Sequence, residues 1–140
     1  MDSFDLCEVT EMLDDPSFDG TVSGQNELPI MIENLDDRLV KLTASGELDM
    51  LTAPRFTEAV LSAVGAGPRG VIVDLRRVTF LASAGLTALI VAHREAAASA
   101  VRFTIIADSP TTLRPLTLTD VAGVIGVHPD LAQAVKALAR

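Results

Sequence analysis

The chain has 140 residues, 49% of them hydrophobic, which is enough for one domain with a core of its own. Its single cysteine, Cys7, excludes an internal disulfide bond. No apolar run reaches the roughly 18 residues that a membrane-spanning helix needs, so we expect a cytoplasmic protein with no membrane insertion.

The negative charge is concentrated at the start of the chain. Residues 1–28 contain eight Asp and Glu and no Lys or Arg, whereas the remaining residues contain eleven acids and eleven bases. The formal net charge of −8 therefore belongs to this segment, and no basic face is left to bind nucleic acid. The sequence predicts a flexible acidic extension (1–28) before a folded domain (29–140). A short amphipathic helix is the alternative for the extension, because four of its apolar residues have helical spacing: Leu6, Val9, Met12 and Leu13.

The folded domain begins with the pattern of a β-hairpin. Apolar residues alternate over 30–32, a polar turn follows at 34–38, and a second strand is predicted at 39–43. Residues 46–49 close that strand. A helix is then predicted to start at Thr52, since a proline follows at the first turn, and to stop at the glycines and proline of 65–68.

A β-branched run at 70–75 predicts a strand that is covered on both faces. A second apolar cluster at 78–81 leads into a turn that ends at Ser83. From there, apolar residues recur every three or four positions, which predicts a helix with Ser83 as its N-cap.

The remaining elements continue the alternation of strands and helices. We predict a strand at 103–107, a short helix through Leu116, a last strand at 121–127 and a closing helix from Leu131. The order β-β-α-β-α-β-α-β-α is typical of an α/β fold with a mixed, mostly parallel sheet and helices packed against it.

Residues for catalysis are poorly represented. The two histidines, His93 and His128, cannot form a histidine metal cluster, and we expect His93 to be a half-buried packing residue. The chain has no phosphate-binding glycine loop and no nucleophile elbow. Capping or charge pairing is expected for the acids of the ordered elements, Glu47, Asp49 and Asp74. We therefore expect no enzyme, no catalytic residue, no metal and no cofactor.

The candidate site lies in two loops. Neighbouring parallel strands end at the same edge of a sheet, so the loops at 46–49 and 82–85 should meet there, with Asp49 and Ser83 as neighbours. The free amides of a helix N-terminus favour a phosphate. Gly85 would allow another backbone or a partner to approach closely. This edge is predicted to be a surface that another protein recognises and modifies.

The chain resembles the STAS domain of bacterial anti-sigma factor antagonists from Pro29 to Arg140. The matching segments are Gly46-Glu47-Leu48-Asp49, Ala53-Pro54, Val71-Ile72-Val73-Asp74-Leu75, Val78-Thr79-Phe80 and Ser83-Ala84-Gly85-Leu86-Thr87-Ala88-Leu89. The resemblance implies a STAS fold and binding to an anti-sigma factor with a kinase-like ATPase fold, which releases a sigma factor. It also implies that the partner phosphorylates a serine in an Asp-Ser-Ser/Thr-Gly loop, which breaks the complex.

The chain departs from that loop pattern at two positions. Ala82 stands in place of the aspartate, and Ala84 in place of the usual phosphoacceptor serine, while Ser83 matches the residue before the acceptor. Three interpretations remain open: an antagonist without the usual phosphoswitch, an antagonist with Ser83 as a displaced phosphoacceptor, and a relative outside sigma control.

The partner-binding face is expected to comprise Glu47, Asp49, Ala82, Ser83, Ala84, Gly85, Leu86 and Thr87. A STAS accessory subunit of a lipid-transport ATPase is the alternative function, because Ser-Ala-Gly also fits the corresponding loop of those subunits. The oligomeric state stays open.

Overall fold

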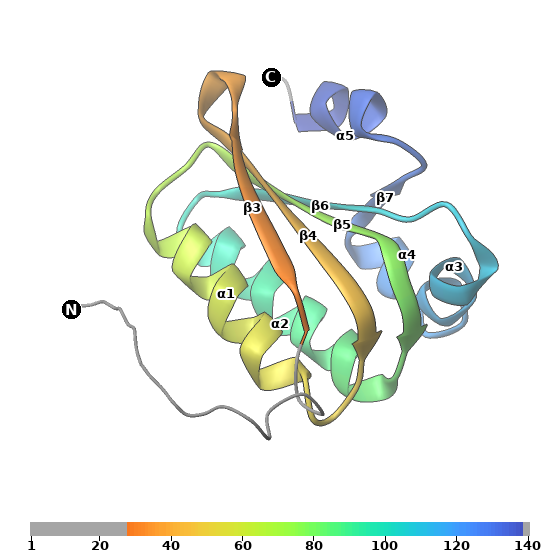
Figure 1. Cartoon of the computed structure of the whole chain (residues 1–140). Coiled ribbons are helices and arrows are strands. Elements are labelled where there is room, and N and C mark those ends of the chain that lie inside the picture. The colour runs from red at the N-terminus through yellow and green to blue at the C-terminus, as the bar shows by residue number, and fades with distance from the viewer. Residues whose placement is uncertain (1–27, 139–140) are drawn as a thin grey trace.

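The computed structural model describes residues 28–138, in which five strands form one sheet (Figure 1). The strand order is β3 (Ile30–Leu35), β4 (Leu39–Leu48), β5 (Gly70–Leu81), β6 (Arg102–Ile106) and β7 (Gly126–His128). β3 and β4 are antiparallel, joined through the 3₁₀ turn η2 (Asp36–Arg38), and every later pair is parallel. The predicted hairpin and the mixed, mostly parallel sheet are confirmed.

Helices cover the two faces of the sheet unequally. α1 (Ala53–Gly65) and α2 (Ser83–Ala98) lie side by side on one face (Figure 1). The main core lies beneath them and also includes α3 (Pro110–Leu118) and α4 (Val121–Val124). Fully buried side chains of this core include Leu28, Leu48, Phe56, Leu89 and Leu116.

The opposite face carries a smaller core under α5 (Leu131–Leu138). Leu39, Ile72 and Ile106 pack there against Ala134 and Leu138 of α5. Side chains alternate between the two faces of a strand, so the residues that follow Leu39 and Ile72 on this face are Lys41 and Asp74. Because α5 is only eight residues long, it covers the first part of the face and leaves the rest open.

One predicted strand is partly wrong. Residues Val121–Val124 form the short helix α4, and only Gly126–His128 pair with β6. The chain enters α4 through Asp120, whose φ is +65°, and the amide of Ile125 donates to the carbonyl of Val121. A short run of apolar residues fits a buried helical turn as well as a strand, so periodicity alone could not separate the two.

The expected acidic extension, except for Leu28, lies outside the described residues. The other helices and strands are present where they were predicted, with the strand from Gly70 extending to Leu81.

Candidate functional site

The ends of β4 and β5 bring the two candidate loops together. Glu47 pairs with Phe80 and Leu48 with Leu81 in the parallel register. The amide of Ala82 then donates to the carbonyl of Leu48, with 2.9 Å between nitrogen and oxygen. The expected proximity of segments 46–49 and 82–85 is therefore present.

Two irregularities in β5 change the direction of its side chains close to this edge of the sheet. The register shifts between Thr43 and Ser45 and again between Gly46 and Glu47, and each time β5 contributes one extra residue. An extra residue bends a strand and re-aims the side chains that follow it. Phe80 lies directly after the second irregularity and is 51% exposed, although it was predicted as part of an apolar cluster.

Asp49 organises the loop before α1. Its Oδ1 accepts hydrogen bonds from the amides of Leu51 (3.0 Å) and Thr52 (3.2 Å). The Thr52 hydroxyl donates to the carbonyl of Glu47 (2.8 Å) and accepts from the amide of Asp49 (3.0 Å). Asp49 thus stabilises the turn before α1, whose N-cap is Thr52 without a side-chain cap hydrogen bond, and its carboxylate is directed at its own loop.

The prediction that Ser83 is the N-cap of α2 is wrong by one residue. Ala82 is the N-cap, with an extended backbone (φ −89°, ψ 172°), and its carbonyl accepts from the amides of Gly85 and Leu86. Ser83 is the first helical residue and is exposed. Alanine has no side-chain acceptor, so no side chain among the described residues caps this end.

Gly85 allows α2 to pack closely against the end of β4. A Cβ atom built on Gly85 would lie 2.8 Å from Cγ of Leu48, 2.9 Å from Cδ1 of Leu81 and 3.0 Å from the carbonyl oxygen of Leu48. Gly85 is buried, so the close approach that it allows is to the chain's own backbone. Leu86 is also buried, whereas Thr87 is exposed.

The predicted partner-binding residues thus divide by exposure. Glu47, Ser83 and Thr87 are exposed, and Asp49, Ala82 and Ala84 are half-buried. Gly85 and Leu86 shape the surface from beneath and present little to a partner.

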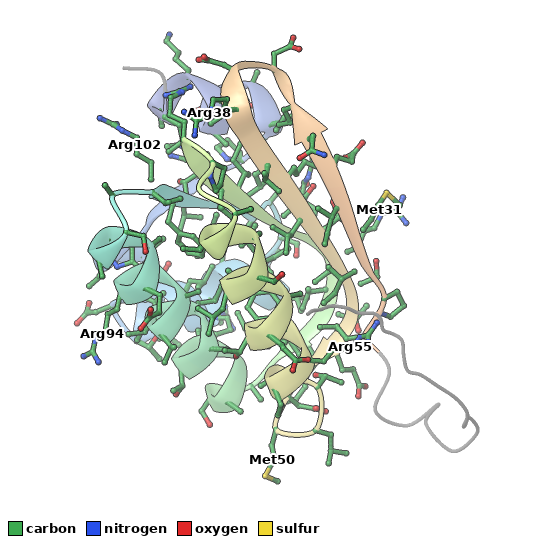
Figure 2. The ribbon with its side chains drawn as sticks, turned by 90° about the vertical axis from the view of Figure 1, so that its left-hand side faces the viewer. Met31, Arg38, Met50, Arg55, Arg94 and Arg102 are labelled. Carbon is green, nitrogen blue, oxygen red and sulfur yellow. The ribbon has the colours of Figure 1, made fainter. Side chains whose placement is uncertain are left out.

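Three large apolar side chains at this edge were missed by the sequence reasoning. Met50 is 75% exposed, Leu51 58% and Phe80 51%. Figure 2 shows Met50 at the tip of the loop between β4 and α1, pointing away from the body of the protein. The sequence contained a signal, because Met50 and Leu51 are adjacent large apolar residues in the segment between the predicted strand and helix. We define the docking face by its exposed residues: Glu47, Met50, Leu51, Phe80, Ser83 and Thr87.

Asp74 carries the one carboxylate with a clearly shifted pKa among the described residues. Its side chain is buried, and it accepts two hydrogen bonds from the guanidinium of Arg76, at 3.0 Å and 2.8 Å. Burial acts to raise the pKa of Asp74, but hydrogen bonds from the side chain and amide of Arg76, and the charges of Arg76 and Lys41, outweigh it and lower the pKa. The charge pairing expected for Asp74 is confirmed.

Within the part of the chain that the structure describes, neither histidine belongs to a group of metal-ligating side chains. His93 is half-buried, as predicted, and its ring meets Phe103 edge-on with centroids 6.1 Å apart. Within residues 28–138, no three His, Cys, Asp or Glu side chains are grouped to hold a metal ion. Over the same residues, none of the helices has the length and apolar character required to cross a bilayer.

The fold and sequence together establish the family. The model of the STAS domain matches residues 31–134, so the chain belongs to the STAS domain family. The curated relative RsfB of Mycobacterium tuberculosis, an anti-sigma-F factor antagonist, is 35% identical over 77 residues. That match spans 55% of this chain and 62% of the relative.

Solved structures extend the comparison to nearly the whole domain. A crystal structure of an anti-sigma factor antagonist from Mycobacterium paratuberculosis superimposes with a TM-score of 0.75 at 30% identity, over 84% of this chain and 98% of that one. The anti-sigma factor antagonist SpoIIAA in its unphosphorylated form gives a TM-score of 0.66 at 20% identity, over 79% and 96% of the chains. At that identity the second likeness supports the fold alone.

Proposed function

We propose that this chain is an anti-sigma factor antagonist that binds a kinase-like anti-sigma factor and so frees a sigma factor. The observation that carries the proposal is the 30% identity over 98% of the antagonist from Mycobacterium paratuberculosis. In this proposal the chain acts by binding and has no catalytic residue of its own.

The docking face is the proposed contact surface. Its exposed apolar side chains, Met50, Leu51 and Phe80, come from two adjacent segments, and polar Glu47, Ser83 and Thr87 lie on the same segments. An apolar centre with polar groups at its margin is the usual composition of a protein interface. Large exposed apolar side chains grouped in this way mark a site of interaction.

The proposed complex lacks the usual phosphoswitch. Ala84 occupies the position where the family has its acceptor serine, and an alanine side chain cannot be phosphorylated. Ser83 is the nearest hydroxyl, exposed at the first residue of the 16-residue helix α2. A phosphate there would be favoured by the free amides of the helix, and it would place close to two negative charges on the docking face.

A reconstitution tests this proposal. The full chain is added to purified complexes of candidate kinase-like anti-sigma factors with their sigma factors, with and without ATP. We expect release of the sigma factor in both conditions and an unchanged intact mass of the chain after incubation with ATP. A mass increase of one phosphate that disappears in Ser83→Ala would identify Ser83 as a displaced acceptor. Failure to release any sigma factor, with capture of a lipid-transport ATPase from the native cell, would favour the accessory-subunit function.

A further inference from the structure

The sheet face opposite α1 and α2 carries a second surface, which the proposed function does not use. Beyond the part that α5 covers, two adjoining hollows of about 390 Å³ each lie over β3, β4 and β5. The two hollows share Met31, Thr43 and Arg77, so they form one continuous surface. We call this surface the open sheet face.

The open sheet face has a surplus of positive charge. Its two hollows are lined by four cations and two carboxylates: Lys41, Arg55, Arg76, Arg77, Glu33 and Asp74. Lys41 lies 3.2 Å from Glu33, and Arg76 lies 2.8 Å from Asp74, so the surplus belongs to Arg55 and Arg77. The extra residue in β5 between Asp74 and Arg77 lets both consecutive arginines line the same hollow.

The same surface offers an apolar contact. Met31 is 61% exposed, and Figure 2 shows its side chain projecting from β3 away from the helices α1 and α2. Cations around an exposed apolar side chain match a segment that contains acids and apolar residues in alternation.

The chain itself supplies such a segment, and it begins at the rim of this surface. Pro29 lines one hollow, and its carbonyl accepts from the amide of Ser45 (3.1 Å). The carbonyl of Leu28 accepts from Nε of Arg55 (3.2 Å), so the chain is held there by a cation of α1 that reaches the rim of the open sheet face. Residues 1–27 contain eight acids and no bases, and their apolar residues include Phe4, Leu6, Met12, Leu13 and Phe18.

We propose that the acidic segment 1–27 docks on the open sheet face of its own domain. An extended chain of this length reaches up to roughly 90 Å, far more than the roughly 10 Å across three strands. Because the segment is tethered at the surface, its local concentration is of the order of millimolar, and modest charge attraction is enough to hold it. None of the residues that line the open sheet face belongs to the docking face, although Ser45 and Glu47 are only two residues apart on β4, so this inference can fail while the proposed function holds.

Because Cys7 is the single cysteine, one spin label can be attached at a defined position in the full chain, which allows a direct test. A nitroxide spin label is attached to Cys7, and paramagnetic broadening of backbone amides is measured by NMR in ¹⁵N-labelled protein. We expect the strongest loss of signal at Met31, Thr43 and Arg77. The loss should largely disappear in Arg77→Glu and at about 1 M salt, where the screening length is near 3 Å. The control is Arg94→Glu, an exposed cation of α2 on the other side of the molecule from Met31 (Figure 2), which should leave the broadening unchanged.

Three results would overturn the inference. Broadening spread evenly over the domain would show that the segment has no preferred site, and broadening concentrated at Ser83 and Thr87 would place it at the start of α2. Broadening that persists in Arg77→Glu, while the remaining amide spectrum shows an intact fold, would exclude charge recognition by this surface. A mixed sample separates contacts within one chain from contacts between chains. It contains spin-labelled protein without ¹⁵N and ¹⁵N-labelled protein without a spin label. Equal broadening in this sample would assign the contact to a second copy.

Discussion

The contact beneath Gly85 gives the sharpest stability prediction. Gly85 lies in the first turn of α2, and its missing side chain allows the helix to rest on Leu48 at the end of β4. In Gly85→Ala, the new methyl group would lie within 3.0 Å of two leucine side chains and of the carbonyl oxygen of Leu48. The carbonyl belongs to the backbone of β4, so relief requires α2 or the strand to move.

The size of the effect follows from two opposing contributions. Overpacking in a filled core costs about 1–3 kcal/mol. Alanine is favoured over glycine within a helix by about 0.5–1 kcal/mol. The net expectation is that Gly85→Ala lowers the free energy of unfolding by up to about 2.5 kcal/mol, and Gly85→Arg by considerably more.

Urea denaturation of Gly85→Ala beside Gly65→Ala measures this difference. Gly65 is the last residue of α1, it is exposed, and a Cβ there would meet nothing within 4 Å. The control should therefore gain about 0.4–1 kcal/mol through the lower entropy of its unfolded chain. Opposite signs for the two variants are the expected result. A Gly85→Ala variant that is stabilised as much as Gly65→Ala would refute the close contact between α2 and β4.

Two further changes test the helix start and the buried carboxylate. In Ala82→Asp, the N-cap gains an acceptor at a backbone conformation that already suits it, so the free energy of unfolding should rise by about 1 kcal/mol, whereas Ser83→Ala should change it by less than about 0.5 kcal/mol. Urea denaturation measures both changes. A decrease of about 1 kcal/mol in the free energy of unfolding of Ser83→Ala would show that Ser83 is the N-cap of α2. Because the folded state lowers the pKa of Asp74, its carboxylate stabilises the fold fully above its unfolded pKa of about 3.9, and this contribution is lost as the pH falls through the folded pKa. Asp74→Asn should lower the melting temperature at neutral pH and flatten its fall in acid; an unchanged acid profile would contradict the pairing with Arg76.

The order of elements was predictable because each strand and helix has its own hydrophobic period. The alternation at 30–32 and the β-branched run at 70–75 indicated strands, and the spacing of Leu86 and Leu89 indicated a helix. Parallel pairing of β4 with β5 followed from the crossover helix between them, and it placed the two candidate loops at one edge.

The details of the site were harder to predict from the sequence. They depend on one-residue differences in the position of the N-cap and in the register of β5 with β4. The N-cap at Ala82 carries no side-chain signal, so the hydroxyl of Ser83 attracted the assignment. The sequence placed Phe80 in an apolar cluster before a turn, and its exposure could not be predicted because the two irregularities in β5 depend on pairing with β4. Gly85 predicted a close approach by another backbone or by a partner, and only the position of Leu48 shows that the chain's own backbone occupies the space.

The open sheet face was not foreseen for a related reason. Lys41 is more than 30 residues before Asp74 and Arg77, and their meeting depends on the register of β4 with β5 and on the extra residue in β5. Their exposure depends in addition on how little of the sheet α5 covers.

The affinity of the docking face for a kinase-like anti-sigma factor tests the central claim most directly. Isothermal titration would compare the unmodified chain with Leu51→Asp and Phe80→Asp, and with Ile32→Asp as a control, since Ile32 is 55% exposed but lies on the edge strand β3. A charge placed in the apolar centre of the interface should weaken binding at least tenfold, which corresponds to about 1.4 kcal/mol, while the control should bind as the unmodified chain does. Equal affinity of all four proteins would contradict the claim that this edge of the sheet is the contact surface.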